Sequence, residues 1–154
     1  MDENWNEALA RLERVWPRVA GKETPPAEVT APPDPLTAER EAARRLLEAA
    51  ECGGRASAAL RELAGECAAA ARELAAEEFL RCGALPERGM ARSAAGGLLR
   101  RLRAAYLALL RAEAAYAAAA GRASPERDAL CARLAAKKPA QRRRVFDLVA
   151  AFMA

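Results

Sequence analysis

The chain contains no histidine and few aromatic residues, and these absences exclude several kinds of site before any motif is considered. Its 154 residues include 2 Trp, 2 Tyr and 3 Phe. Without histidine, the chain lacks the commonest general base and the commonest nitrogen ligand for metals. No two cysteines form a CxxC pair, so their spacing argues against a zinc site and favours free thiols in a reducing compartment. They are Cys52, Cys67, Cys82 and Cys131.

Long apolar runs are also missing. No stretch of 18 consecutive apolar residues occurs, so we expect no membrane span. The first residues, MDENWNEAL, include acidic side chains and no apolar core of the kind found in signal peptides. We therefore expect a cytoplasmic location.

What the chain has in abundance is alanine, leucine, arginine and glutamate, with few β-branched residues. These residues have high intrinsic helix propensity, so the composition predicts an all-α protein. A length of 154 residues is sufficient for one domain with a hydrophobic core.

The composition changes twice along the chain and divides it into three segments. Residues 1–20 have the spacing of an amphipathic helix, and its apolar stripe is a possible interaction surface. Residues 21–35 include five prolines and predict an extended linker. Residues 36–154 predict a helical bundle. The stripe should dock on the bundle, on a partner or on a second copy, because an exposed stripe of this kind would be adhesive. It contains Trp5, Leu9, Leu12 and Trp16.

Four bundle helices are expected, at about 36–51, 57–82, 98–120 and from Ser124 onward. Asp34 or Thr37 could cap the first, and Ser124-Pro125 is a strong helix start. Pro139 should kink or divide the fourth helix. Residues 84–97 suit a crossover between two helical hairpins. Alternatives remain for which residues face inward, namely Leu46 or Leu47, Tyr106 or Ala105, and Glu113 or Ala112. The fourth stripe is Arg127, Leu130, Leu134, Lys138, Gln141, Val145, Leu148 and Phe152.

The second of these helices carries a motif. Leu60, Leu63, Cys67, Ala70 and Leu74 recur at steps of three and four. Together with Leu63-Ala64-Gly65-Glu66, Phe79-Leu80 and Gly83, the segment resembles the second helix of the ferritin-like, rubrerythrin-type di-iron proteins. The resemblance implies a ferritin-like four-helix bundle made of two helical hairpins.

The same resemblance implies that most of the metal ligands have been lost. A di-iron site in this fold needs a Glu from each of two helices and a Glu-x-x-His from each of the other two. Five of the six positions hold other residues here, namely Cys67, Ala70, Leu109, Lys138 and Gln141. The surviving carboxylate is Glu39, with Glu41 as its rival. Such a set cannot hold two divalent ions, so we expect no metal, no cofactor and no enzymatic activity.

Lys138 brings its own positive charge to the position that a metal would occupy. A buried ammonium requires a partner, so we predict an inward ion pair between Glu39 and Lys138, with Gln141 as a hydrogen-bonding neighbour. The alternative is that Lys138 extends outward to solvent at the Pro139 kink. Cys67 is expected to be a buried, unreactive thiol.

Charge is distributed unevenly, and this leaves three functions open. Residues 90–154 carry 13 basic and 4 acidic side chains, a net +9, whereas residues 1–89 carry 12 basic and 17 acidic, a net −5. The favoured function is a non-catalytic scaffold or protein-interaction protein. One alternative is a metal-dependent oxidase, peroxidase or iron-handling protein. The other, which we expect less, is nucleic-acid binding through Arg100, Arg101, Arg103, Lys137, Arg142, Arg143 and Arg144.

Overall fold

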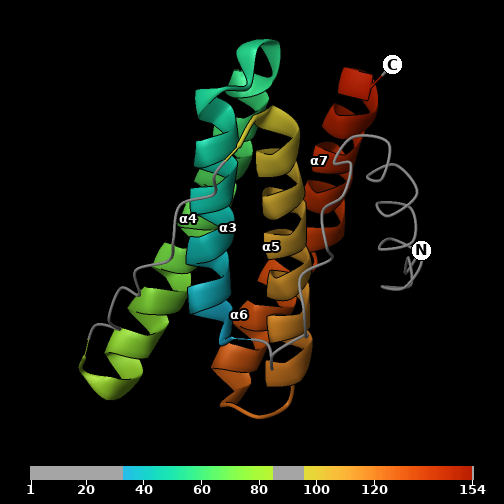
Figure 1. Cartoon of the computed structure of the whole chain (residues 1–154). Coiled ribbons are helices and arrows are strands. Elements are labelled where there is room, and N and C mark those ends of the chain that lie inside the picture. The colour runs from blue at the N-terminus through green and yellow to red at the C-terminus, as the bar shows by residue number, and fades with distance from the viewer. Residues whose placement is uncertain (1–32, 85–95, 154) are drawn as a thin grey trace. The chain divides into compact units, whose positions relative to one another are not determined.

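The computed structural model describes residues 33–84 and 96–153, and every regular element within them is helical (Figure 1). The expected all-α class is therefore confirmed. The predicted N-terminal helix with its tryptophans, most of the linker and most of the connection after the second helix lie outside the described residues. The elements are α3 (Pro35–Glu51), the 3-10 helix η1 (Gly54–Ala56), α4 (Ser57–Cys82), α5 (Leu98–Ala119), α6 (Pro125–Ala135) and α7 (Lys138–Met153).

The helix ends are specified by local sequence. Asp34 caps α3 by accepting hydrogen bonds from Thr37 N at 3.1 Å and Thr37 Oγ1 at 2.7 Å. Ser124 caps α6 by accepting from Arg127 N at 3.3 Å. Each cap is followed by a proline at the first helical position, where a missing N–H costs nothing. Helix α4 ends at Cys82 and is followed by Gly83, whose φ of 73° is a left-handed conformation that favours glycine.

Helix α3 packs against both α4 and α5, and α7 packs against α5. Arg101, near the start of α5, donates to the carbonyl oxygen of Glu48 near the end of α3 at 2.8 Å. At the other end of the bundle, the start of α3, the end of α4 and the end of α5 surround one cavity. Helices α4 and α5 therefore run in the same direction. The end of α4 and the start of α5 therefore lie at opposite ends of the bundle (Figure 1).

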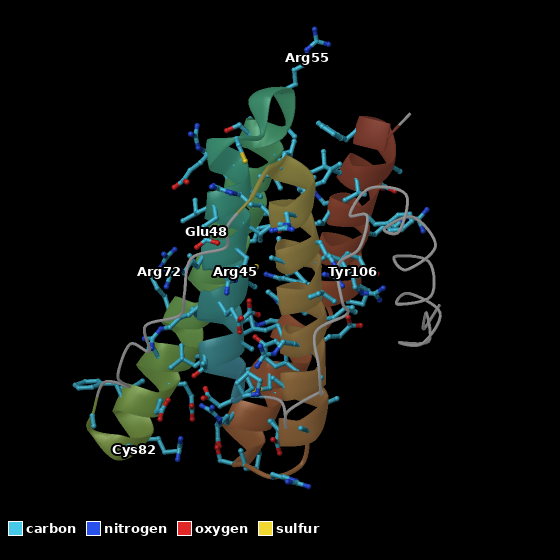
Figure 2. The ribbon with its side chains drawn as sticks, viewed as in Figure 1. Arg45, Glu48, Arg55, Arg72, Cys82 and Tyr106 are labelled. Atoms are coloured by element: carbon cyan, nitrogen blue, oxygen red, sulfur yellow. The ribbon has the colours of Figure 1, made fainter. Side chains whose placement is uncertain are left out.

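The expected inward stripe of α4 is buried along its full length, from Leu60 to Leu74. On α3 the inward residue is Leu46, which is fully buried, and Leu47 is 50% exposed. Both Ala105 and Tyr106 of α5 are buried, because Tyr106 also packs against α7, where its ring centroid lies 6.5 Å from that of Phe146. Figure 2 shows Tyr106 on the side of α5 that faces α7.

The fourth helix is divided, as the proline predicted. Helix α6 ends at Ala135 and α7 begins at Lys138. Pro139 has no N–H to donate to the carbonyl of Ala135, and its ring would collide with that group in a continuous helix. No described helix has both the length and the apolar character needed to cross a membrane.

The prediction that Phe152 faces inward is wrong, because its side chain is 56% exposed. The buried residue of this last stretch is Val149, four positions after the buried Val145. Helix α7 packs mainly on α5, so its contact line is narrow. Phe152 lies four residues after Leu148 and three after Val149, and this position is past that line, in solvent.

Candidate functional site: a buried charge network

Four of the residues singled out in the sequence meet in the interior of the bundle. Glu39 comes from α3, Cys67 from α4, and Lys138 and Gln141 from the first turn of α7. Their exposed fractions are 0%, 0%, 1% and 4%. They meet because each lies on the inward stripe of its own helix, and the break before α7 begins a new helical turn at Lys138.

The ammonium group of Lys138 lies at the centre of this network. Its Nζ is 2.5 Å from Glu39 Oε2, 2.9 Å from Gln141 Oε1 and 3.7 Å from Cys67 Sγ. An ammonium has three N–H donors, and three acceptors surround this one. Lys138 therefore points inward to Glu39 and does not extend to solvent.

The second oxygen of Glu39 is also engaged. Tyr116 of α5 donates its hydroxyl proton to Glu39 Oε1 at 2.6 Å. Burial, followed by the negative charge of Glu39, raises the pKa of the Tyr116 hydroxyl above its ordinary value, so the phenol remains a donor. Sequence reasoning used Tyr116 only to set the helix register. A buried tyrosine needs a hydrogen-bond partner, and that requirement was the available signal.

Gln141 links the interior to the surface. Its Nε2 donates to Glu66 Oε2 at 3.1 Å, and its Oε1 accepts from Lys138. Arg144 of α7 lies 3.4 Å from both Glu62 Oε2 and Glu66 Oε1. Glu66 precedes the inward Cys67 by one residue and lies at the edge of the stripe, so the apolar spacing gave no sign of its role.

Burial suppresses the reactivity of Cys67. Loss of solvent raises the pKa of its thiol from 9.0 to about 12, although the nearby positive charge of Lys138 acts in the opposite direction. A thiol in this state is a weak nucleophile and a weak metal ligand.

The other two positions at which the resemblance implies lost metal ligands are buried as well. The exposed fractions of Ala70 and Leu109 are 6% and 0%. The rival carboxylate Glu41 points to the surface, where it forms an ion pair with Arg111 at 3.5 Å. Of the pair left open on α5, Ala112 is fully buried and Glu113 is partly buried. Glu113 accepts from Arg142 Nε at 3.0 Å, which forms a second internal ion pair on α7 that the sequence did not predict.

Beside the network lies a groove of about 330 Å³ between α4 and the α6–α7 break. Ala70 and Gln141 form part of its wall. The charged residues that line it are two acidic and two basic ones, Glu66, Glu73, Lys137 and Arg144.

Several arginines of the basic half pair with carboxylates of the acidic half. Arg101 lies 3.1 Å from Glu51, and equivalent pairs join Arg127 to Glu77 and Arg133 to Glu73. Together with the pairs of Arg111, Lys138 and Arg144, these interactions connect helices α3 and α4 to helices α5, α6 and α7. Arg143 pairs within its own helix with Asp147. Arg142 is buried at 3% exposure, which removes it from any surface for nucleic acid.

The network pairs one carboxylate with one ammonium group and offers few groups that could bind a metal ion. Among residues 33–84 and 96–153, no three side chains of the Asp, Glu, Cys and His types are grouped as a metal site would require. The residues at the expected di-iron position do not fit that cofactor, because one carboxylate, one amide and one protonated thiol surround a fixed positive charge.

Comparison of the chain with known proteins finds no family model, curated protein or solved structure that it matches.

Proposed function

We propose that this chain is a non-catalytic helical scaffold of ferritin-like ancestry, in which Lys138 occupies the position of the lost metal centre. The scaffold would act through protein contacts, with the amphipathic segment 1–20 as the contact element. The single observation that carries the non-catalytic assignment is the saturation of Lys138 by Glu39, Gln141 and Cys67.

A saturated ammonium has neither of the properties that catalysis would use. It is protonated, so it is not a nucleophile or a base, and its three hydrogen bonds hold it away from a substrate. Its positive charge also repels a metal ion from the one carboxylate that remains. The charge that a metal would supply to neutralise Glu39 is supplied by the protein itself.

The ferritin-like ancestry is supported by where the expected ligand positions lie in the bundle. Glu39, Cys67, Lys138 and Gln141 were selected as former ligand positions from motif spacing, and they lie together although three helices contribute them. The parallel course of α4 and α5 agrees with two hairpins joined by a crossover.

Metal content is the direct test of this proposal. Protein purified without a histidine tag should hold no iron by elemental mass spectrometry, before or after incubation with ferrous iron. Its presence should also leave dioxygen consumption no faster than that of ferrous iron in the same buffer without protein. Retention of about two iron ions per chain would restore the oxidase alternative.

The interaction role has a separate test. Sedimentation equilibrium of the full chain should show self-association, or a purified partner should bind, through the amphipathic segment. A W5A/W16A variant should lose that association while keeping the helical circular dichroism of the bundle. The role would be contradicted if the chain is a monomer at all concentrations and if the W5A/W16A variant binds the partner as well as the unsubstituted chain does.

A further inference from the structure

Helix α4 lies at the edge of the bundle and packs mainly against α3 (Figure 1). The residues on its side opposite the buried Cys67 point away from the interior, because they lie about half a turn from that residue around the helix axis. We call this side the outer face of α4. Its centre is formed by small residues, and charged residues line both edges. The small residues are Ala58, Gly65, Ala69 and Ala76, one edge carries Arg61 and Arg72, and the other carries Glu62 and Glu73.

The glycine at the centre of this face has no packing role among the residues that the structure describes. Gly65 is exposed and lies in the interior of α4, where glycine is less favourable than alanine because it loses more backbone entropy. A Cβ added at Gly65 would meet no described heavy atom within 4 Å, apart from its own turns of the helix. Glycine on an exposed helix face allows the backbone of another helix to approach closely. Leu80, at the end of the same face, is 85% exposed, which is unusual for a large apolar side chain.

The charges at the two edges are not used equally within the chain. Arg61 and Arg72 are exposed and form no ion pair with any residue that the structure describes. Figure 2 shows Arg72 pointing away from the other helices. Glu62 and Glu73 pair with arginines of α7 and α6, but their side chains remain 68% and 43% exposed. A carboxylate has two oxygens and can accept from a second guanidinium group, so these edges are complementary to each other.

The positions of these charges favour a second copy of the chain, in one orientation. Each arginine directly precedes a glutamate of the opposite edge, as Arg61-Glu62 and Arg72-Glu73. In a parallel pair of identical helices, each edge of one helix lies beside the opposite edge of the other, at the same height. An antiparallel pair would instead place each edge beside the same edge and bring arginine close to arginine.

We propose that the outer face of α4 is a self-association surface, on which α4 of a second copy packs in parallel. Gly65 and Ala69 lie at the closest approach of the two helices. Arg61 pairs with Glu62 of the second copy, and Arg72 pairs with Glu73 of the second copy. This surface is separate from the amphipathic segment 1–20, so the inference is independent of the proposed function.

Sedimentation equilibrium of the W5A/W16A chain tests the surface, because association through segment 1–20 does not contribute in that variant. The molar mass should rise with concentration to twice that of the single chain. Adding G65L should weaken dimerisation by roughly tenfold or more, since the leucine overpacks the closest approach. Adding G65A instead is the matched control and should keep the dimer, because alanine remains small. Circular dichroism should show an intact fold in both, since Gly65 faces open space within the chain.

Charge reversal tests the edges independently of the glycine. In the W5A/W16A chain, R61E/R72E should also abolish dimerisation, because four glutamates per copy would then line the interface. The R55E/R122E control makes the same change in net charge at two exposed arginines outside this face, and it should keep the dimer. A dimer that persists in G65L or in R61E/R72E, or that is lost equally in R55E/R122E, would overturn the proposal. A W5A/W16A chain that is monomeric at all concentrations would overturn it without affecting the role of segment 1–20.

The orientation has its own measurement. Dyes attached to Cys82 of the two copies, in a C52S chain that also carries W5A/W16A, should transfer fluorescence energy efficiently. The exposed Cys82 lies at the end of α4, and a parallel pair places both ends together. Dimers without energy transfer would overturn the parallel arrangement and with it the proposed ion pairs.

Discussion

At the scale of single residues, the ion pair between Glu39 and Lys138 gives the clearest prediction. The K138M substitution leaves a carboxylate buried without a counter-charge, which should cost about 3–5 kcal/mol of unfolding free energy. The double substitution E39Q/K138M removes both charges and keeps an amide oxygen that can accept from Tyr116, so it should recover most of that loss. Chemical denaturation of the three proteins measures the difference. A double variant as unstable as K138M would show that the pair is not the origin of the cost.

A second residue-scale prediction concerns Cys67 and pH. Its thiol has a pKa of about 12 in the folded protein and 9.0 without burial. Between these values the unfolded chain loses a proton that the folded chain keeps, so the unfolded state binds fewer protons and stability falls as pH rises. The thiol's contribution is fully present below pH 9.0 and decreases above it.

Denaturation at a series of pH values from 8 to about 11 should therefore give a shallower decline for C67A than for the unsubstituted chain, by at most roughly 1.4 kcal/mol per pH unit. Exposed Cys82, which Figure 2 shows at the end of α4, provides the control. The C82A substitution should leave the decline unchanged. A C67A chain with the same slope would contradict burial as the cause of the raised pKa.

At the scale of helices, the two capped starts differ in a way that can be measured. Replacing Ser124 with alanine removes one hydrogen bond to the backbone and should cost about 1 kcal/mol. The D34A substitution removes a backbone bond and the bond from Thr37 Oγ1, so it should cost more. T37V is the control, because it removes only the second bond. If thermal denaturation ranks S124A as more damaging than D34A, the capping interpretation of Asp34 is contradicted.

Helix ends and inward stripes could be predicted from the sequence because local chemistry determines them. The capping residues, Gly83 and Pro139 act within one or two turns of their own positions. Neighbouring positions on one helix were harder to separate. Leu46 and Leu47 have the same hydrophobicity, and Phe152 was assigned inward by spacing alone. Only the contact line between two packed helices decides such cases.

The candidate site was predictable only in part, for a related reason. Glu39 and Lys138 were paired because opposite charges on inward stripes require each other. The contacts of Tyr116 with Glu39 and of Glu66 with Gln141 depend on how four helices are rotated about their axes. The pair between Glu113 and Arg142 depends on the packing of α7 against α5. The spacing of residues within one helix does not indicate which residues of another helix lie close to them.

At the scale of the whole molecule, carboxylates of the acidic half pair with several arginines of the basic half among the residues that the structure describes. Pairs such as Arg111 with Glu41 and Arg133 with Glu73 use the cations that a nucleic acid would otherwise contact. Exposed pairs contribute little individually to stability, so their main effect is on the potential outside the protein.

The unsubstituted chain should accordingly bind a single-stranded or duplex oligonucleotide no more tightly than about 10⁻⁴ M at physiological salt, measured by fluorescence anisotropy. The E41Q/E73Q substitutions release Arg111 and Arg133 and should strengthen binding, with a steeper dependence on salt because more phosphates are contacted. The E78Q/E126Q control makes the same change in net charge. Because neither carboxylate has an ion-pair partner among the described residues, it should have a smaller effect. Tight, salt-sensitive binding by the unsubstituted chain would show that the internal pairs leave a functional basic surface, and would restore the nucleic-acid alternative.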